Sequence, residues 1–141
     1  MGACRAPATP MLARAGLHMW EEPIISGKRG SGTIFFSGCS LGCIFCQNRA
    51  ISRSAVGRAV SADELAREML RLEREGAHNI NFVTPTHFAP AVRDSVAIAR
   101  SLGLTLPIVY NTGSYDTVQT LRALEGTVDI YLPDLKYYRP E

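Results

Sequence analysis

The sequence lacks the features that mark membrane, disordered and disulfide-stapled proteins. Its 141 residues carry 15 basic and 13 acidic side chains, so the formal net charge is only +2. Such balanced charge argues against a surface for nucleic acid or acidic lipid, and a hydrophobic content of 46% argues against disorder. Four cysteines are too few to form a disulfide scaffold in a chain of this length. We therefore expect one folded domain of ordinary size, with no nucleic-acid and no membrane partner.

Long apolar runs and targeting segments are also missing. The longest uncharged stretch, residues 30–48, mixes its apolar residues with glycines, serines and cysteines, which makes it a poor membrane helix. The N-terminus has no apolar segment of the kind found in signal peptides, and Ala6 stands where myristoylation requires Ser or Thr. These observations predict a cytoplasmic protein, whose thiols stay reduced and available to metal.

Apolar β-branched runs alternate with helical stretches after an opening, residues 1–27, that we expect to be irregular. The runs predict strands at residues 34–36, 79–84, 107–110 and 128–132. Between them, glycines and capping residues delimit helices at about residues 61–76, 90–103 and 117–126, the first with a Ser61–Glu64 capping box. The alternation predicts right-handed βαβ units and a parallel sheet.

Four parallel strands make an incomplete fold of the α/β class. A full (β/α)₈ barrel needs roughly 250 residues, so four strands supply about half of one. They would leave two open edges on a type of sheet that is normally covered. Either the chain is a small open α/β domain, or residues 28–141 are the N-terminal portion of a larger barrel. We favour a partial parallel (β/α) barrel represented by its first four strands only.

Three of the four cysteines lie within one short segment directly after the first predicted strand. Cys39, Cys43 and Cys46 have C-x₃-C-x₂-C spacing. Such short spacings let a single loop wrap around a metal centre, and Gly38 and Gly42 permit the backbone angles that wrapping needs. Structural zinc sites and ferredoxin clusters use four protein ligands. Three thiolates on a four-iron cluster leave one iron open to another molecule, which is typical of a catalytic centre.

Two other interpretations of the thiols remain. Zinc would complete its tetrahedral shell by recruiting Cys4 or His18 as a fourth ligand. Alternatively the three cysteines are buried and inert, although inert cysteines are expected singly along a chain rather than in a cluster.

The cysteine motif, with the aromatic Phe45 directly before its last cysteine, resembles that of the radical S-adenosylmethionine (radical SAM) superfamily. Residues 32–39 and 45–48 resemble one branch, the proteins related to pyruvate formate-lyase activating enzyme. Similar segments lie at residues 17–23, 84–87, 107–112 and 128–136, so the resemblance runs from about Leu17 to Tyr137. Relatives continue through two further βα units, and the chain resembles a truncated member of that branch.

This resemblance implies a cofactor, a reaction and partners. Cys39, Cys43 and Cys46 would hold a [4Fe-4S] cluster, whose fourth iron the amine and carboxylate of SAM would chelate. An electron from the cluster would split SAM into methionine and a 5′-deoxyadenosyl radical that abstracts hydrogen. The implied partners are SAM, a flavodoxin- or ferredoxin-like one-electron reductant and, for an activating enzyme, a glycyl radical enzyme as protein substrate. The alternatives are a non-catalytic iron–sulfur-binding fragment or pseudoenzyme and a zinc-binding interaction domain.

Polar side chains gather where the predicted strands end, which is where parallel α/β folds bind ligands. Beyond the cysteine loop, they are Thr84, Thr86 and His87 after the second strand, Asn111 and Thr112 after the third, and Asp134 and Lys136 after the fourth. The two-residue spacing of Asp134 and Lys136 puts a carboxylate and an ammonium on the same side of an extended segment.

The resemblance assigns SAM contacts to several of these residues. An Asp-x-Lys at this place helps relatives bind SAM, which implies that role for Asp134 and Lys136; the alternative is a solvated ion pair. Phe45 would stack near the adenine or simply pack. Thr86 and His87 stand where many relatives carry Gly-Gly-Glu, a departure that puts the usual amine contact in question and leaves Thr86 as an alternative helix cap. The predicted cofactor-binding set is Phe45, Thr86, His87, Asn111, Asp134 and Lys136.

Overall fold

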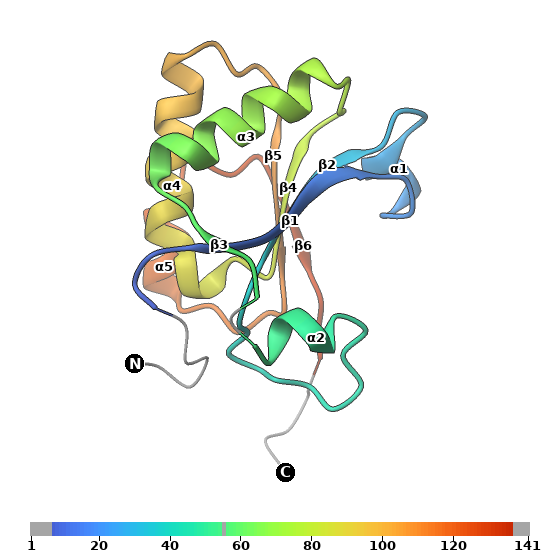
Figure 1. The fold of residues 1–141 in the computed structure, drawn as a ribbon, viewed down its shortest axis with the longest axis vertical. Coiled ribbons are helices and arrows are strands. Elements are labelled where there is room, and N and C mark those ends of the chain that lie inside the picture. The colour runs from blue at the N-terminus through green and yellow to red at the C-terminus, as the bar shows by residue number, and fades with distance from the viewer. Residues whose placement is uncertain (1–6, 55, 137–141) are drawn as a thin grey trace.

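A computed structural model describes residues 7–54 and 56–136, through which one six-stranded sheet runs (Figure 1). The strands lie in the order β3-β1-β2-β4-β5-β6. Their bounds are β1 Met11–His18, β2 Ser31–Phe36, β3 Arg58–Ala59, β4 Ile80–Val83, β5 Ile108–Thr112 and β6 Ile130–Pro133. The helices are α1 Pro23–Ser26, α2 Arg49–Ser52, α3 Ala62–Arg74, α4 Ala89–Ser101 and α5 Val118–Ala123, with a 3₁₀ turn, η1, at Thr86–Phe88. In this part of the chain, no helix is both long and apolar enough to cross a membrane.

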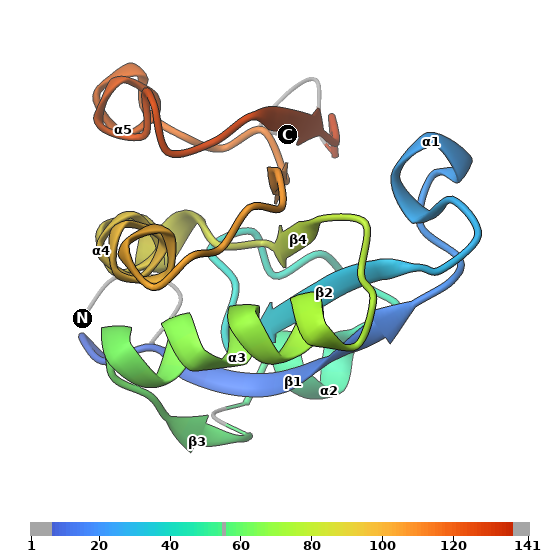
Figure 2. The ribbon, with the colours of Figure 1, turned by 90° about the horizontal axis from the view of Figure 1, so that it is seen from above.

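Strands β2, β4, β5 and β6 are mutually parallel, which confirms the four predicted strands and the βαβ alternation. Helices α3, α4 and α5 provide the crossovers and lie along one face of the curved sheet, while α1 lies on the other side (Figure 2). The carboxyl ends of all four parallel strands therefore meet at one edge, where the segment around α2 also lies (Figure 1).

The core forms between the sheet and these helices. Ile34, Phe82 and Ile108 point from three adjacent strands toward the helices and are fully buried. They pack against the apolar stripes of α3 and α4, whose fully buried members include Leu65 and Val92. Because side chains alternate along a strand, the residues between these positions face the opposite side of the sheet. That opposite face is the one that carries the candidate site.

Helix α3 begins as the sequence predicts. The Ser61 hydroxyl accepts a hydrogen bond from the Glu64 N–H at 3.2 Å, and the Ser61 N–H donates to the Glu64 carboxylate at 2.8 Å. This reciprocal pair is the predicted capping box. Beyond the C-terminus of the helix, Gly76 has a φ of +92°, a conformation that glycine adopts without steric cost.

The expectations of an irregular opening and of only four strands are wrong. Within residues 1–27, β1 pairs antiparallel with β2 over most of its length, and β3 pairs with the other side of β1. The Thr33 hydroxyl adds a hydrogen bond of 2.9 Å to the Gly16 carbonyl across this pair. The sheet is thus mixed rather than parallel throughout, and the outer edge of β2, expected to be open, is covered. Parallel β6 lies at the sheet edge farthest from β3.

Replacing Ser61, the N-cap of α3, tests how much the capping box contributes to the stability of the protein. Ser61→Ala removes the hydroxyl that accepts from Glu64, so we expect the free energy of unfolding to fall by about 1 kcal/mol in urea denaturation. Ser101→Ala, at the last residue of α4, serves as the control because its hydroxyl only bonds a carbonyl three residues earlier. We expect the control to change stability by less than about 0.5 kcal/mol; equal effects of the two variants would contradict the capping account.

Candidate functional site

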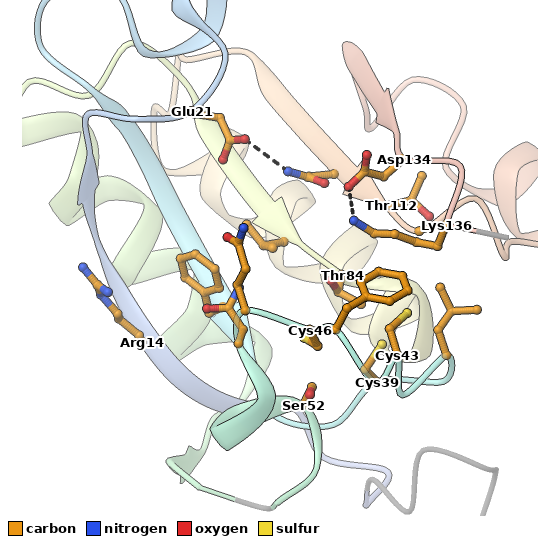
Figure 3. A pocket seen from close by; sticks show the side chains of 18 of the residues that line it. Arg14, Glu21, Cys39, Cys43, Cys46, Ser52, Thr84, Thr112, Asp134 and Lys136 are labelled. Carbon is orange, nitrogen blue, oxygen red and sulfur yellow. Dashed lines mark hydrogen bonds and ion pairs between the residues drawn. The ribbon is translucent and has the colours of Figure 1, made fainter.

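A cavity of about 480 Å³ opens on the face of the sheet that the large helices do not cover. Figure 3 shows its walls, which come from β1, from the loop after β2 and from the ends of β4, β5 and β6. The lining residues nearest the parallel strands include Phe35, Val83 and Asn111, all at positions that alternate with buried core residues. The cavity therefore lies where the strand polarity predicts a ligand site.

The cysteine loop forms one wall of the cavity. Cys39, Cys43 and Cys46 all line it as free thiols, with Cys43 buried and the other two half-buried. Gly38 and Gly42 have φ values of +83° and +57°, which confirms the predicted need for glycine at both positions. The short spacing of the motif thus brings all three thiols to the same cavity.

Contacts from the following segment hold this loop. The Gly38 N–H donates to the Ile51 carbonyl at 2.9 Å, at the entry to the loop. In the middle of the loop, the guanidinium of Arg53 donates to the Gly42 carbonyl. A Cβ added to Gly42 would lie only 3.1 Å from the Arg53 guanidinium carbon, so the absence of a side chain permits this approach. The loop is therefore shaped by backbone contacts that leave its thiols uncommitted.

The donor set fits a thiolate-bound metal centre. Thiolates select zinc and iron–sulfur clusters, whereas magnesium and calcium prefer oxygen ligands. Within residues 7–54 and 56–136, no group of three or more His, Cys, Asp or Glu side chains converges closely enough to hold a metal ion. The three thiols thus share the cavity without forming a coordination shell. His18, one of the two predicted fourth ligands for zinc, lines the same cavity, and Cys4 lies outside the described residues.

The structure brings four of the six predicted cofactor-binding residues to the thiols' cavity, namely Phe45, Asn111, Asp134 and Lys136. Asp134 and Lys136 form an ion pair with each other (Figure 3). The Asp134 N–H donates to the Thr112 carbonyl at 2.8 Å, which extends the β5–β6 pairing to the cavity edge. A carboxylate and an ammonium are therefore presented together opposite the cysteine loop.

A glycine lets the cysteine loop approach the ends of β5 and β6. A Cβ built on Gly113 would lie 2.5 Å from Leu41 Cδ1 and 3.9 Å from Lys136 Cγ. The side chain of Leu41 occupies the space that any larger residue at position 113 would fill. This packing couples the position of the cysteine loop to the strand ends that carry Asp134 and Lys136.

The structure does not bring Thr86 and His87 to this cavity. The 3₁₀ turn η1 leads the chain from β4 into α4 and packs Phe88 edge-on against Phe36, with ring centroids 5.3 Å apart. Thr86 lines a smaller cavity of about 220 Å³ beside α4 and α5, and the buried hydroxyl of Tyr110 donates to Asp116 at 3.0 Å. The alternative of a Thr86 helix cap is also wrong, because Phe88 caps α4 without any side-chain hydrogen bond.

His87 instead lies beneath the start of the cysteine loop. Its Nε2 lies 3.0 Å from the Ser37 carbonyl, so that nitrogen carries the proton and donates. Its Nδ1 is buried and has no hydrogen-bond partner within the described parts of the chain. Burial lowers the pKa of His87, while the bond to Ser37 raises it to a smaller extent. His87 is thus a neutral support for the residue two positions before Cys39.

The sequence placed Thr84 among the polar side chains at the strand ends but did not predict its backbone conformation. Thr84 lines the cavity with a φ of +52°, an unusual conformation for a β-branched residue. Its N–H donates to the Asn111 carbonyl at 2.8 Å. Strained backbone of this kind clusters at functional sites, but no local sequence signal marks it here.

Glu21 also lines the cavity, and nothing in the sequence indicated a chemical role for it. Its carboxylate accepts hydrogen bonds from the side-chain amides of Asn81 at 3.1 Å and Asn111 at 3.5 Å. Glu21 follows β1, the strand that the sequence did not predict, so its position over the sheet was not foreseeable from its neighbours. The signal that was available is a pair of asparagines, Asn81 inside the predicted strand 79–84 and Asn111 directly after the predicted strand 107–110.

Fold and site together define an α/β protein with a thiol-lined cavity at the carboxyl ends of parallel strands. The profile of the Radical SAM superfamily matches residues 33–141, and the chain belongs to that superfamily. Members of this superfamily usually bind a [4Fe-4S] cluster and SAM.

The chain is 33% identical over 130 residues to the uncharacterized protein MJ0674 of Methanocaldococcus jannaschii, a match that covers 86% of this chain and 36% of that protein. The chain therefore spans about a third of the length of this relative. No solved structure matches the chain.

The lowered pKa of His87 predicts a pH-dependent stability. Because the folded pKa lies below the ordinary value of 6.5, the neutral imidazole favours folding above that value, and this contribution is lost as pH falls through the folded pKa. Denaturant titrations from about pH 7.5 to about pH 5.5 should show stability falling more steeply in the wild type than in His87→Gln, which cannot titrate. Parallel pH profiles for the two proteins would contradict this account.

Proposed function

We propose that Cys39, Cys43 and Cys46 hold a [4Fe-4S] cluster and that the protein cleaves SAM reductively for hydrogen abstraction. The observation that carries the proposal is that three free thiols of one loop face a cavity of about 480 Å³ in a chain of the Radical SAM superfamily. When bound there, the cluster supplies the electron that splits SAM into methionine and a 5′-deoxyadenosyl radical.

The other cavity residues bind and orient SAM in this proposal. The Asp134 carboxylate accepts hydrogen bonds from SAM, and the Lys136 ammonium pairs with the negative charge of its carboxylate. Phe45 offers an aromatic face for the adenine, and Asn111 offers an amide that both donates and accepts. Support for these roles comes from their common cavity and from the contact between Asp134 and Lys136. Thr86 and His87, which lie outside the cavity, support the fold around it.

The finer assignment follows the resemblance of residues 32–39 and 45–48 to the pyruvate formate-lyase activating enzyme branch. On that basis the protein is an activating enzyme that abstracts hydrogen from a glycyl radical enzyme in the cytoplasm. A flavodoxin- or ferredoxin-like protein supplies the electron. The chain covers 36% of its relative MJ0674, so this activity is proposed for the whole protein.

Anaerobic reconstitution tests the cluster and its ligands. We expect a brown protein with about four irons per chain that forms 5′-deoxyadenosine from SAM after reduction. Replacing Cys39, Cys43 or Cys46 singly by Ser should abolish 5′-deoxyadenosine formation, whereas Cys4→Ser should leave the iron content unchanged. Iron binding without SAM cleavage would favour the non-catalytic fragment. A colourless zinc protein that loses its metal in Cys4→Ser or His18→Gln would favour the interaction domain.

A second experiment separates SAM binding from cluster binding. Asp134→Asn and Lys136→Met each remove a charge from the cavity, so we expect SAM affinity to fall about tenfold in equilibrium dialysis while iron content stays unchanged. Glu125→Gln is the matched control, because this exposed carboxylate lies outside the cavity. Unaltered SAM affinity in both cavity variants would show that Asp134 and Lys136 form only a solvated ion pair.

A further inference from the structure

The face of the sheet that borders the cavity carries polar side chains where a purely structural sheet would carry apolar ones. Asn81 alternates with the core residues Ile80 and Phe82 and lies opposite Thr33 of β2 and Val109 of β5. Asn111 occupies the same face one strand further along and lines the cavity. Asn81 is nevertheless fully buried, so its amide requires hydrogen-bond partners and an explanation.

Glu21 reaches these amides from the loop after β1. Its Oε2 accepts from Asn81 Nδ2 at 3.1 Å and its Oε1 from Asn111 Nδ2 at 3.5 Å. The two neutral amides orient the carboxylate but leave its charge unneutralised. The other acidic residue that lines the cavity, Asp134, is instead paired with Lys136. Glu21 therefore presents an oriented negative charge to the cavity.

The hydrogen bonding of this cluster is incomplete. Asn81 is fully buried, and its amide donates to Glu21, which fixes the orientation of the amide group. The other end of that amide, Oδ1, is buried and has no partner among the residues that the structure describes. A buried acceptor without a donor is costly and uncommon in native proteins. The described residues of the cluster thus offer an oriented carboxylate to the cavity and supply no donor with positive charge.

We propose that Glu21 and Asn111, with Asn81 positioning the carboxylate, form a subsite for a protonated primary amine of the hydrogen-donor substrate, which in a protein substrate is a lysine side chain. An ammonium group has three donors and a full positive charge, which matches a cavity-lining carboxylate that is hydrogen-bonded by two neutral amides. This inference rests on the proposed function, because it assigns the subsite to the molecule that loses hydrogen. The amine pairs with Glu21, and Asn81 acts as a positioning residue that orients the carboxylate from below.

The subsite shares Asn111 with the residues proposed to bind SAM, but Glu21 itself lies away from the thiols. In Figure 3, Glu21 lies in the upper part of the view, and Cys39, Cys43 and Cys46 lie lower and to the right. The remaining charged or titratable side chains that line the cavity are Arg14, His18, Asp134 and Lys136. One cavity therefore holds a thiol end and a carboxylate end, and a substrate amine held at the carboxylate end leaves the thiol end free for SAM.

An NMR titration of the whole protein tests the subsite with n-butylammonium as the probe. We expect the side-chain amide resonances of Asn81 and Asn111 to shift on titration, and N-butylacetamide, which lacks the charge, to leave them unchanged. Glu21→Gln keeps the shape of the side chain but removes its charge, and should weaken binding of the probe at least about tenfold. Glu22→Gln is the matched control, since Glu22 is exposed and its side chain makes no capping hydrogen bond. No response to the amine, or equal binding in Glu21→Gln, overturns the proposal.

A second arm distinguishes a substrate amine from the amine of SAM itself. In cluster-loaded protein, SAM should leave n-butylammonium bound, and Glu21→Gln should change SAM affinity by less than about twofold. Displacement of the probe by SAM, together with weaker SAM binding in Glu21→Gln, would overturn the proposal by assigning Glu21 to SAM. A protein that binds the amine through Glu21 yet never cleaves SAM would support the subsite and refute the proposed function.

Discussion

The alternation of side chains across β2, β4 and β5 is the constraint on which the site depends. Ile34, Phe82 and Ile108 bind the sheet to its helices and are fully buried, so the residues between them must face the other side. On that side the chain places a cavity rather than a second helical layer. A register slip of one residue would exchange the two faces, so the packing of the core and the composition of the cavity are fixed together.

The contacts that hold the cysteine loop in place do not involve its thiols. Its entry is fixed by Gly38 and by the His87 bond to Ser37, and its middle by the bond from Arg53 to Gly42. The side chain of Leu41 packs the loop against Gly113 at the end of β5. These contacts restrict the backbone of the loop, which reduces the conformational entropy that metal binding must overcome, while the thiols converge only on binding. A thiol-only donor set on one loop agrees with membership in the Radical SAM superfamily.

Elements with local signals could be predicted, and elements defined by distant contacts could not. The capping box at Ser61 and the β-branched runs of the parallel strands are local, and the structure has both. Strand β1 contains Arg14 and Gly16 and becomes a strand only by pairing with β2, which lies beyond α1 in the chain. Because β1 was not predicted, the position of Glu21 was not predicted either. The hydrogen-bond partners of Glu21 are 60 and 90 residues away in the sequence. Likewise His87 sits after a predicted strand, but the turn of η1 directs it under the loop and away from the cavity.

We propose that three thiols of one loop bind a cluster with one iron open to SAM. This can be tested by electron paramagnetic resonance of the reduced, reconstituted protein, recorded with and without SAM. We expect SAM to change the g values of the cluster signal, because SAM binds at the iron that no cysteine occupies. A cluster signal that is identical with and without saturating SAM would contradict it.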